Sequence, residues 1–548
     1  MSRKLAMYDV RGIQDYIYKT AKVQDAIGAS AIVEDIISEA LKEAVEKEEL
    51  SYDLEWYDEN GVLPYVVSKA SDTDVQVLYI GGGNAFVSFQ DEDICQRVNH
   101  RMSRYVLEKT YSLQLAIAVT DQTENYADDY KNIFDEMVRV KANMEVSKPF
   151  GALPVMDVEI KTGLPACPVE KKDGDWVIGI SRETDLKKAK EDLVREDLIQ
   201  RAKIFDNYVE SKGVDSTLAV VHIDGNNMGL RIRKLIGTTE DYETAVNKMR
   251  EISYCINHSY KSVYEQMENH FNGYAGKGDS KKKQYNVLKI LTAGDDITYV
   301  CKGKYALSTV EYFCGEIGKK TMNGGTNEKD IYLYGFSVCA GVAYIGSHFP
   351  FSVGYEVAEA CCDSAKDMAK KPENMLPVDQ DGKVITNVEG TAKAGVSYKI
   401  GNWVDFQICK NIHTGDLDKT RKLEYVTSHN EKLLIRPYEL PLLKLDSRND
   451  AINKYENLKK NIKYFQNDKN IPHSHAKKLR NLYSSGQEVV NEFAAFLASR
   501  GWKMPDGTVD MYTEDNQALW YDALELFDCF EEVDVEKIQK EETGHGDL

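Results

Sequence analysis

Apolar and polar residues follow the same order of patterns twice along the chain. In the first half an apolar run ends in Asp9, and residues 10–44 then place apolar side chains at helical spacing. In the second half another apolar run ends in Asp224, and a second helical stretch follows Gly229. Short apolar runs are typical of strands, and recurrence every three to four residues is typical of helices. We therefore expect each half to begin with a strand, a turn and a helix.

A short glycine-bearing turn between two apolar runs comes next in each half. The turns lie at residues 81–84 and 293–296, and this pattern predicts a β-hairpin. Each half then has a third apolar run and a helical stretch that carries a lysine: Ile117 with Lys141, and Ala340 with Lys366.

The spacing of these features indicates a duplicated domain. Asp9 and Gly83 are 74 residues apart, and Asp224 and Asp295 are 71 residues apart. Strands that alternate with helices around a central hairpin are typical of an α+β sandwich with a ferredoxin-like βαββαβ order. This is the topology of a palm domain. We predict a first palm at residues 1–165, a connector at 166–215, a second palm at 216–410 and a C-terminal helical domain at 411–548.

Composition is that of an ordinary globular protein, with 42% apolar and 29% charged residues. The formal charge of -20 argues against a coat of nucleic acid, because nonspecific affinity for a polyanion depends on clustered Lys and Arg. A local basic groove remains open at residues 454–480, where eight Lys or Arg face only Glu456 and Asp468. The plainer interpretation is a solvated helix face that binds nothing.

The sequence has neither a membrane span nor the apolar core of a signal peptide. Its ten cysteines form no CxxC pair and have no His at zinc-ligand spacing. We expect reduced thiols and a cytoplasmic protein.

The strongest candidates for chemistry are Asp224 and the pair Asp295–Asp296. The first strand and the central hairpin are expected to be neighbours in the sheet, which would bring all three carboxylates together. Adjacent residues point to opposite sides of a strand, so one acid of the pair is expected to join the cluster directly while the other supports it. Either motif alone is an ordinary turn or solvated loop. Their joint placement favours catalysis.

The turn after Asp224 leads into a helix, and backbone amides at such an entrance form a cradle for phosphate. A lysine on the later helix would add a point charge to a triphosphate. The predicted nucleotide-binding residues in this half are Gly225, Asn226, Asn227, Met228, Gly229, Gly294 and Lys366. An oxygen-rich ligand set suits two Mg²⁺ or Mn²⁺ ions. The predicted metal ligands are Asp224, Gly225, Asp295 and Asp296.

Several of these segments resemble a known family. HIDGNNMG at 222–229, TAGDD at 292–296 and the run SVCAGVAYIG to MAKK at 337–371 are similar to the second palm of the large polymerase-cyclase subunit of type III CRISPR effectors, a relative of GGDEF cyclases. GIQDYIYKTAKVQDAIGAS at 12–30 and GGGNAFV at 81–87 resemble that subunit's first, noncatalytic palm. The resemblance implies an ATP-dependent synthase of cyclic oligoadenylate with one nucleotide on each palm.

The chain departs from the family pattern in places. The usual turn is Gly-Gly-Asp-Asp, whereas Ala293 replaces the first glycine here, and its methyl group would narrow the approach of a nucleotide. No His-Asp dipeptide precedes the first palm and no zinc-ribbon cysteines separate the palms, so we expect the family's nuclease domain to be missing. In the first palm the turn has no acid. Gly82 and Gly83 are predicted to form a nucleotide platform there, and a degenerate structural copy is the alternative.

Two function classes follow. The first is a metal-dependent nucleotidyltransferase that makes cyclic oligonucleotides from ATP in antiphage defence. The second is an RNA-binding subunit of a CRISPR-like effector complex whose site is vestigial or switched by RNA. A templated polymerase is disfavoured, because no fingers or long basic duplex channel is visible in the sequence. RNA and effector subunits are the macromolecular partners implied by the resemblance.

Overall fold

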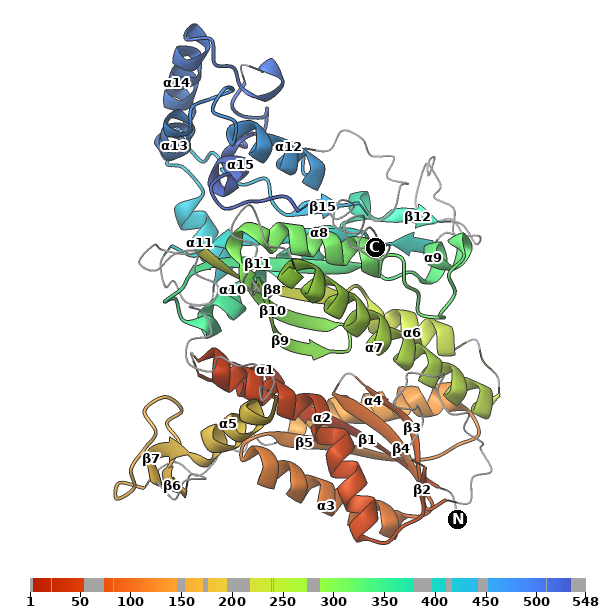
Figure 1. The fold of residues 1–548 in the computed structure, drawn as a ribbon. Helices are drawn as coiled ribbons and strands as arrows, with labels where there is room; N and C mark the ends of the chain where they lie inside the picture. Colours follow the sequence, from red (N-terminus) through yellow and green to blue (C-terminus); the bar gives the residue numbers. More distant parts are fainter. Residues whose placement is uncertain are drawn as a thin grey trace, which may run out of the picture.

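The computed structural model describes residues 3–20, 22–53, 73–81, 83–144, 153–170, 176–194, 217–237, 239, 241–273, 286–378, 397–410, 416–441, 452–508 and 510–533. Figure 1 shows three parts stacked along the long axis of the molecule. A first sheet with its helices lies at one end, a second sheet lies in the middle, and the C-terminal helices lie at the other end. None of the described helices combines the length and apolarity needed to cross a bilayer.

The first sheet has five strands in the order β2-β3-β4-β1-β5. Its strands are β1 (Lys4–Arg11), β2 (Tyr52–Asp53), β3 (Val75–Gly81), β4 (Asn84–Phe89) and β5 (Gln114–Asp121). Its helices are α1 (Ile13–Ile17), α2 (Val23–Lys47), α3 (Glu92–Thr110) and α4 (Tyr126–Asn143).

The second sheet has six strands in the order β15-β14-β11-β8-β10-β9. Its strands are β8 (Thr217–Gly225), β9 (Val287–Ala293), β10 (Asp296–Lys302), β11 (Val338–Gly346), β14 (Asn402–Ile408) and β15 (Tyr438–Leu440). The helices around it are α6 (Met228–Ile236), α7 (Tyr242–Gly273), α8 (Ala306–Ile317), α9 (Glu328–Tyr334) and α10 (Phe351–Ala369). A 3-10 turn η2 (Gly303–Tyr305) precedes α8, and η3 (Pro372–Asn374), β12 (Leu376–Val378) and β13 (Ser397–Lys399) follow α10.

The two sheets share one plan. The orders β5-β1-β4-β3 and β11-β8-β10-β9 are the same when the strands are matched in chain sequence. Both central hairpins also contain a bulge at the same place, because one extra residue lies three positions before the end of the hairpin's first strand. That residue is Leu78 in β3 and Ile290 in β9. The predicted α+β fold with two βαββαβ units is confirmed.

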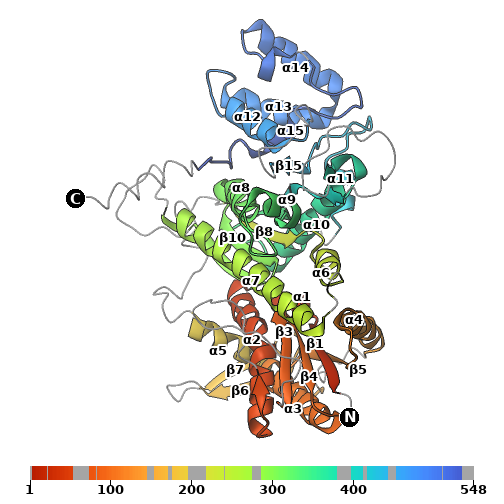
Figure 2. The ribbon, with the colours of Figure 1, turned by 90° about the vertical axis from the view of Figure 1, so that its right-hand side faces the viewer.

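Each palm has one helix that also packs on the sheet of the other palm. α2 packs on its own sheet and also on β9, and α7 packs on its own sheet and also on β3 (Figure 2). As a result, the buried apolar clusters contain residues of both palms. Leu5 and Met7 share a core with Val246 of α7, and Val220 of the second sheet shares a core with Ile36 of α2. Because the buried apolar surface is continuous, the two palms form one folding unit.

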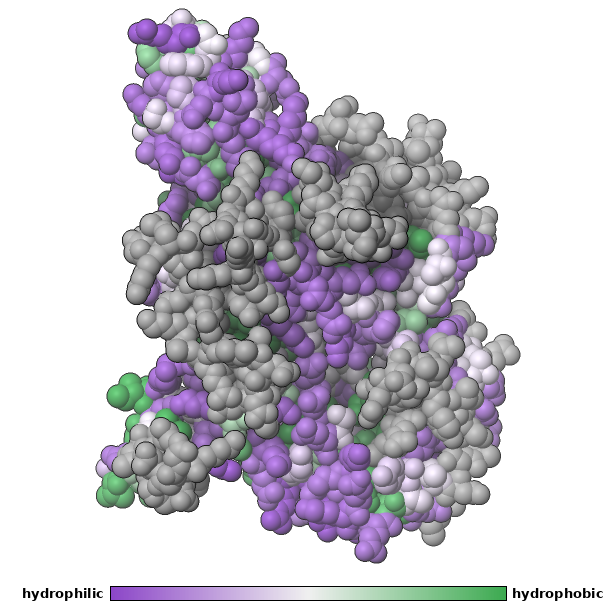
Figure 3. All heavy atoms as spheres, in the orientation of Figure 1, coloured by the Kyte–Doolittle hydropathy of each residue, from purple (hydrophilic) through white to green (hydrophobic). Residues whose placement is uncertain are grey.

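The connector forms a hairpin and a helix: β6 (Ala166–Glu170), β7 (Trp176–Ser181) and α5 (Arg182–Val194). α5 packs on α2 and so joins the first palm. Before it, Val155 and Ile160 are 90% and 100% exposed. In Figure 3, hydrophobic atoms gather at the lower left, near β6 and β7 of Figure 1, on an otherwise hydrophilic face.

The C-terminal region consists of α11 (Leu417–Glu424), α12 (Tyr455–Phe465), α13 (His473–Leu482), η4 (Tyr483–Ser485), α14 (Gln487–Ser499), η5 (Pro505–Gly507) and α15 (Tyr521–Leu526). One part of it departs from the predicted boundary at 411. β15 pairs with β14 and so belongs to the second sheet. A strand edge left open would expose unpaired backbone groups, and β15 covers that edge.

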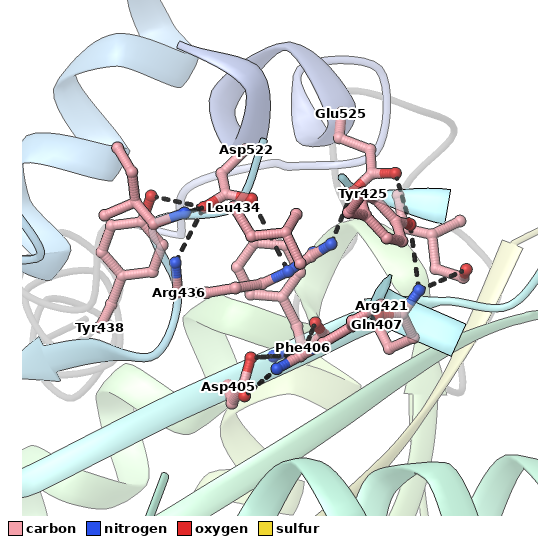
Figure 4. A network of polar contacts seen from close by, with 12 residues as sticks. Asp405, Phe406, Gln407, Arg421, Tyr425, Leu434, Arg436, Tyr438, Asp522 and Glu525 are labelled. Carbon is pink, nitrogen blue, oxygen red and sulfur yellow. Dashed lines mark hydrogen bonds and ion pairs between the residues drawn. The ribbon is translucent and has the colours of Figure 1, made fainter. Parts of the chain in front are cut away.

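Buried ion pairs fasten the C-terminal helices to the second palm (Figure 4). The Arg436 guanidinium lies 3.0 Å from Glu525 of α15 and 4.2 Å from the ring centre of Phe406 in β14. Asp522 accepts hydrogen bonds from the backbone amides of Ile435 and Arg436 and from the Tyr438 hydroxyl. Charges buried in this way are stable only when they are paired, so the C-terminal helices have a fixed place on the sheet.

Candidate active site

Asp224 and Asp296 lie at neighbouring strand ends on one face of the second sheet. Ile223 of β8 is paired with Ile297 of β10, which sets the two aspartates side by side. Their side chains are 29% and 31% exposed. The face on which they lie is the one turned toward α10 and the first palm, because Val220 and Val300, at the same parity, pack there. The acids therefore face the junction of the two palms.

Asp295 lies in the two-residue turn between β9 and β10. Gly294 precedes it with φ of +65°, as expected for the first central position of a hairpin turn. The Asp295 carboxylate closes over Gly225. A Cβ at Gly225 would lie 2.7 Å from Asp295 Oδ2 and 2.8 Å from the Tyr260 hydroxyl. Only glycine at 225 permits this approach, and Asp295 lies near enough to Asp224 for the charge of Asp224 to raise its pKa.

The three acids perturb one another. Burial raises the pKa of Asp295 to about 7, and the charge of Asp224 contributes. Burial also raises the pKa of Asp296 to about 8, with further contributions from Asp224 and Asp295. Burial and neighbouring carboxylates both disfavour the charged form of these acids, and a nearby cation would favour it. Such a site favours a bound cation.

Lys366 of α10 contacts the Oδ2 atom of Asp224. Burial lowers the pKa of Lys366, but neighbouring groups, including Asp224, raise it above its ordinary value, so the side chain is a cation. α10 approaches the sheet closely because Gly341 of β11 has no side chain. A Cβ there would lie 1.9 Å from the Ala358 carbonyl oxygen. Close packing of helix on strand thus delivers the predicted lysine to the predicted aspartate.

In the turn after Asp224, Asn226 bonds within the protein, whereas the start of α6 is open. Asn226 is 4% exposed, and its side-chain amide donates to the Ser337 hydroxyl and the Gly401 carbonyl. Its amide donors are thus used within the protein, so Asn226 shapes the turn. Asn227 has φ of +54° and precedes α6, which begins at Met228. A Cβ at Gly229 would have no atom within 4 Å, so space is open above the first turn of α6.

His222 is a site residue that the sequence reasoning missed. Its Nδ1 lies 3.1 Å from the Thr298 hydroxyl and 3.4 Å from Asp296 Oδ1. Burial lowers the pKa of His222 to about 4, so the imidazole is neutral at neutral pH. The signal was present in HIDG, because residues two apart on a strand share a face. The methyl group of Ala293, which was expected to narrow the approach of a nucleotide, packs against the apolar core.

The first palm contains a counterpart of this site. Lys141 of α4 lies 2.5 Å from Asp9, as Lys366 contacts Asp224. Asn84 pairs with Asp9 across the strands, at the place where the second palm has Asp296. Gly83, with φ of +78°, occupies the place of Asp295, and Gly82 lies outside the described residues. The first site keeps one acid and one lysine, and its formal charges cancel.

The basic run at 454–480 does not form an open positive groove. Five of its eight Lys and Arg residues form ion pairs: Lys454 with Glu439, Lys459 with Glu311, Lys460 with Asp506, Lys463 with Glu532 and Lys477 with Asp528. The plainer interpretation of this run, as a helix face whose charges are compensated, is favoured.

The acidic cluster offers oxygen ligands of the kind that divalent cations prefer. Among the residues that the structure describes, no group of three or more His, Cys, Asp or Glu side chains is placed to hold a metal ion. Mg²⁺ seldom needs such a group, since one or two carboxylates and substrate phosphates commonly hold it. Asp296 Oδ1 is buried without a hydrogen-bond partner in the described part of the chain, as a ligand oxygen awaiting a cation would be. The donor set is all oxygen apart from neutral His222.

No protein-family model and no curated protein sequence matches the chain. Among solved structures, the chain is similar to Csm1 of T. onnurineus at 14% identity and a TM-score of 0.45, over 96% of this chain and 69% of that one. A Csm1–Csm4 cassette in complex with cA4 has a TM-score of 0.44, and one in complex with AMPPNP has 0.42, each at 14% identity and the same two coverages. At these values the likenesses assign no activity, substrate or partner to this chain.

Proposed function

We propose that this protein is a metal-dependent nucleotidyltransferase that joins ATP molecules into a cyclic oligonucleotide, with its catalytic centre on the second palm. The observation that carries the proposal is the cluster of Asp224, Asp295 and Asp296, whose charge is compensated in the protein by one lysine. The cluster lies beside an open helix entrance. Acids, a cation and a phosphate cradle together are the parts that phosphoryl transfer requires.

Asp224, Asp295 and Asp296, with the backbone of Gly225, would hold the cations. Bound Mg²⁺ or Mn²⁺ ions would supply Lewis-acid stabilisation of the attacking and leaving oxygens. Lys366 would leave Asp224 for the triphosphate, because a highly charged phosphate group competes well for an ammonium. The amides at the start of α6 would orient the phosphates, with Asn226 fixing the turn from which they project.

The first palm would hold the second nucleotide without catalysing its transfer. Its single Asp9 is neutralised by Lys141, and Gly83 leaves the turn without a carboxylate. The sequence resemblance that motivates cyclic oligoadenylate as the product also implies one nucleotide on each palm. ATP is the proposed substrate, and RNA or effector subunits are the proposed regulators of activity.

The decisive experiment incubates the purified chain with ATP and Mg²⁺ or Mn²⁺, with and without single-stranded RNA. Mass spectrometry identifies products, and a coupled assay measures pyrophosphate. We expect cyclic oligoadenylate and pyrophosphate from the native protein. A variant with both Asp295→Ala and Asp296→Ala should be inactive while its circular dichroism spectrum and melting temperature show a folded protein.

Two results would redirect the assignment. No product under any condition, combined with binding of RNA, would favour the RNA-binding subunit with a vestigial site. A ladder of linear products that depends on an added template would indicate a polymerase. Product from ATP without a template supports the synthase.

A further inference from the structure

A pocket of about 180 Å³ lies where α12 and α15 meet the edge strand β15 of the second sheet. Its buried lining is apolar and aromatic and includes Tyr438, Leu458, Trp520 and Ala523. Its exposed lining is mostly polar and includes Asn457, Lys460 and Asp506. For comparison, an engineered apolar cavity of about 150 Å³ holds a benzene molecule. The pocket therefore has room for a planar ring.

Trp520 brings an unused hydrogen-bond donor to the lining of this pocket. Its side chain is 7% exposed, and its indole N–H is buried with no acceptor among the described residues. An unpaired buried donor is costly, and native proteins rarely keep one without a bound group or a functional reason. An indole nitrogen donates a hydrogen bond and does not accept one. A ligand that satisfies Trp520 must therefore carry an acceptor.

Two sides of the pocket are held in place by buried hydrogen bonds. The Tyr438 hydroxyl donates to Asp522 of α15 at 2.9 Å, and both residues are labelled in Figure 4. Asp522 also accepts from the backbone amide of Ile435, another lining residue, at 2.9 Å. These bonds fix α15 against the chain that leads into β15. A preformed pocket of this kind loses little conformational freedom when a ligand binds.

The polar lining narrows the class of ligand. Lys460 and Asp506 form an ion pair at 2.7 Å, so their charges cancel. A carboxylate or phosphate inside the pocket would find no uncompensated cation among the described lining residues. The apolar side chain of a protein partner would leave the Trp520 N–H unpaired. A purine base is planar and uncharged, and its ring nitrogens accept hydrogen bonds. Asn461 also lines the pocket, and an asparagine carboxamide matches the donor and acceptor edge of adenine.

We propose that this pocket binds an adenine base, with a ring nitrogen accepting from the Trp520 N–H and with Asn461 on the amino edge of the base. The base belongs either to a free nucleotide or to single-stranded RNA, because both present the same ring. The acids face the first palm, whereas this pocket lies on the side of the C-terminal helices (Figure 1). The inference is therefore independent of the proposed function.

The test measures the binding of AMP and of a short oligoadenylate RNA to the full chain. A chelator is present, so that the acidic cluster holds no cation. Isothermal titration calorimetry gives the Kd for the native protein, Trp520→Phe and Asn461→Leu. Phenylalanine keeps an aromatic ring but removes the N–H, so Trp520→Phe should weaken binding about tenfold. Asn461→Leu should weaken it by a similar factor and should abolish the preference for AMP over UMP.

Trp502→Phe is the matched control. Trp502 also belongs to the C-terminal region, but its ring lies 4.9 Å from that of His475 and does not line the pocket. This variant should bind as the native protein does, and the melting temperature shows whether each variant is folded.

Two results support the pocket and two overturn it. Loss of AMP affinity in the pocket variants identifies a free nucleotide as the ligand, and loss confined to the oligoadenylate identifies RNA. Native affinity in both pocket variants would overturn the proposal, as would failure of the native protein to bind either probe. Pyrophosphate release from ATP, measured separately, decides the proposed function in either case.

Discussion

The two palms have the same strand order, the same hairpin bulge and the same lysine-to-aspartate contact, yet their sites differ in charge. In the first palm, Lys141 neutralises Asp9. In the second, Lys366 contacts Asp224, and Asp295 and Asp296 add two acids with raised pKa values. The scaffold positions a turn, a strand end and a helix equally well in both. Two side chains, one in the turn and one at the start of β10, decide which copy carries the acids that the lysine leaves uncompensated.

The largest expected difference is in ATP turnover, between substitutions of Asp224 and of Asp9, the two aspartates near the ends of the first strands. Asp224→Asn removes a carboxylate at the proposed metal site, and loss of metal stabilisation of a transition state is worth several kcal/mol. ATP turnover should fall on the order of 10³-fold. Asp9→Asn should change turnover less than about tenfold. Initial rates of pyrophosphate release measure both variants, and an equal loss in the two would show that both palms are catalytic.

The bulge of β3 is hydrogen-bonded by a buried side chain, Arg250 of α7. It is fully buried and donates to the carbonyls of Leu78, the bulge residue of β3, and Val77. Arg250→Met would leave these buried carbonyls unpaired and should lower the free energy of unfolding by about 3 kcal/mol. Lys289→Met, beside the bulge of β9, removes a half-exposed lysine and should cost less than about 0.5 kcal/mol. Urea denaturation followed by circular dichroism compares them. Similar losses would mean that the second bulge depends equally on a side chain.

The paired lysines should differ in their contribution to substrate binding. Lys366→Met removes a cation proposed to contact the triphosphate, and a charged hydrogen bond contributes about 1.5–3 kcal/mol. We expect kcat/KM for ATP to fall roughly 10- to 100-fold. Lys141→Met should have a smaller effect, seen as a higher KM for the nucleotide on the first palm. Steady-state kinetics at varied ATP concentration measure both, and a larger loss for Lys141→Met would reverse the assignment.

The smallest effect concerns pH and the stability of the ion-free protein. Asp295 and Asp296 have pKa values of about 7 and 8 in the fold, above those of an unfolded chain. The folded state therefore binds more protons between about pH 4 and pH 8, and its stability falls as pH rises through this window. Asp296→Asn should melt on the order of 2 °C higher than the native protein at pH 8.5 and about equally at pH 5.5. Scanning calorimetry in a chelator tests this, and an equal difference at both pH values would contradict the shifted pKa.

Much of the acidic cluster could be predicted from local pattern. Asp224 and Asp295–Asp296 lie where strand ends meet, and strand order in a βαββ unit follows from chain connectivity. Lys366 was predictable because the helix after the third strand repeats in both copies. The function of Gly225 could not be foreseen in full, because the Asp295 carboxylate that approaches it comes from a turn 70 residues later. Asn226, expected to bind nucleotide, has its amide donors used by Ser337 and Gly401, which lie 111 and 175 residues later in the sequence.

The sequence by itself determined the duplicated α+β plan, the three acids and the lysine, because hydrophobic periodicity and turn chemistry are local properties of the chain. Tertiary structure decided what surrounds those acids. Tyr18 of the first palm stacks on Tyr355 of α10, and α7 and α2 each pack on both sheets. These contacts depend on apolar faces that each palm leaves uncovered, and no local pattern specifies which distant surface will cover them.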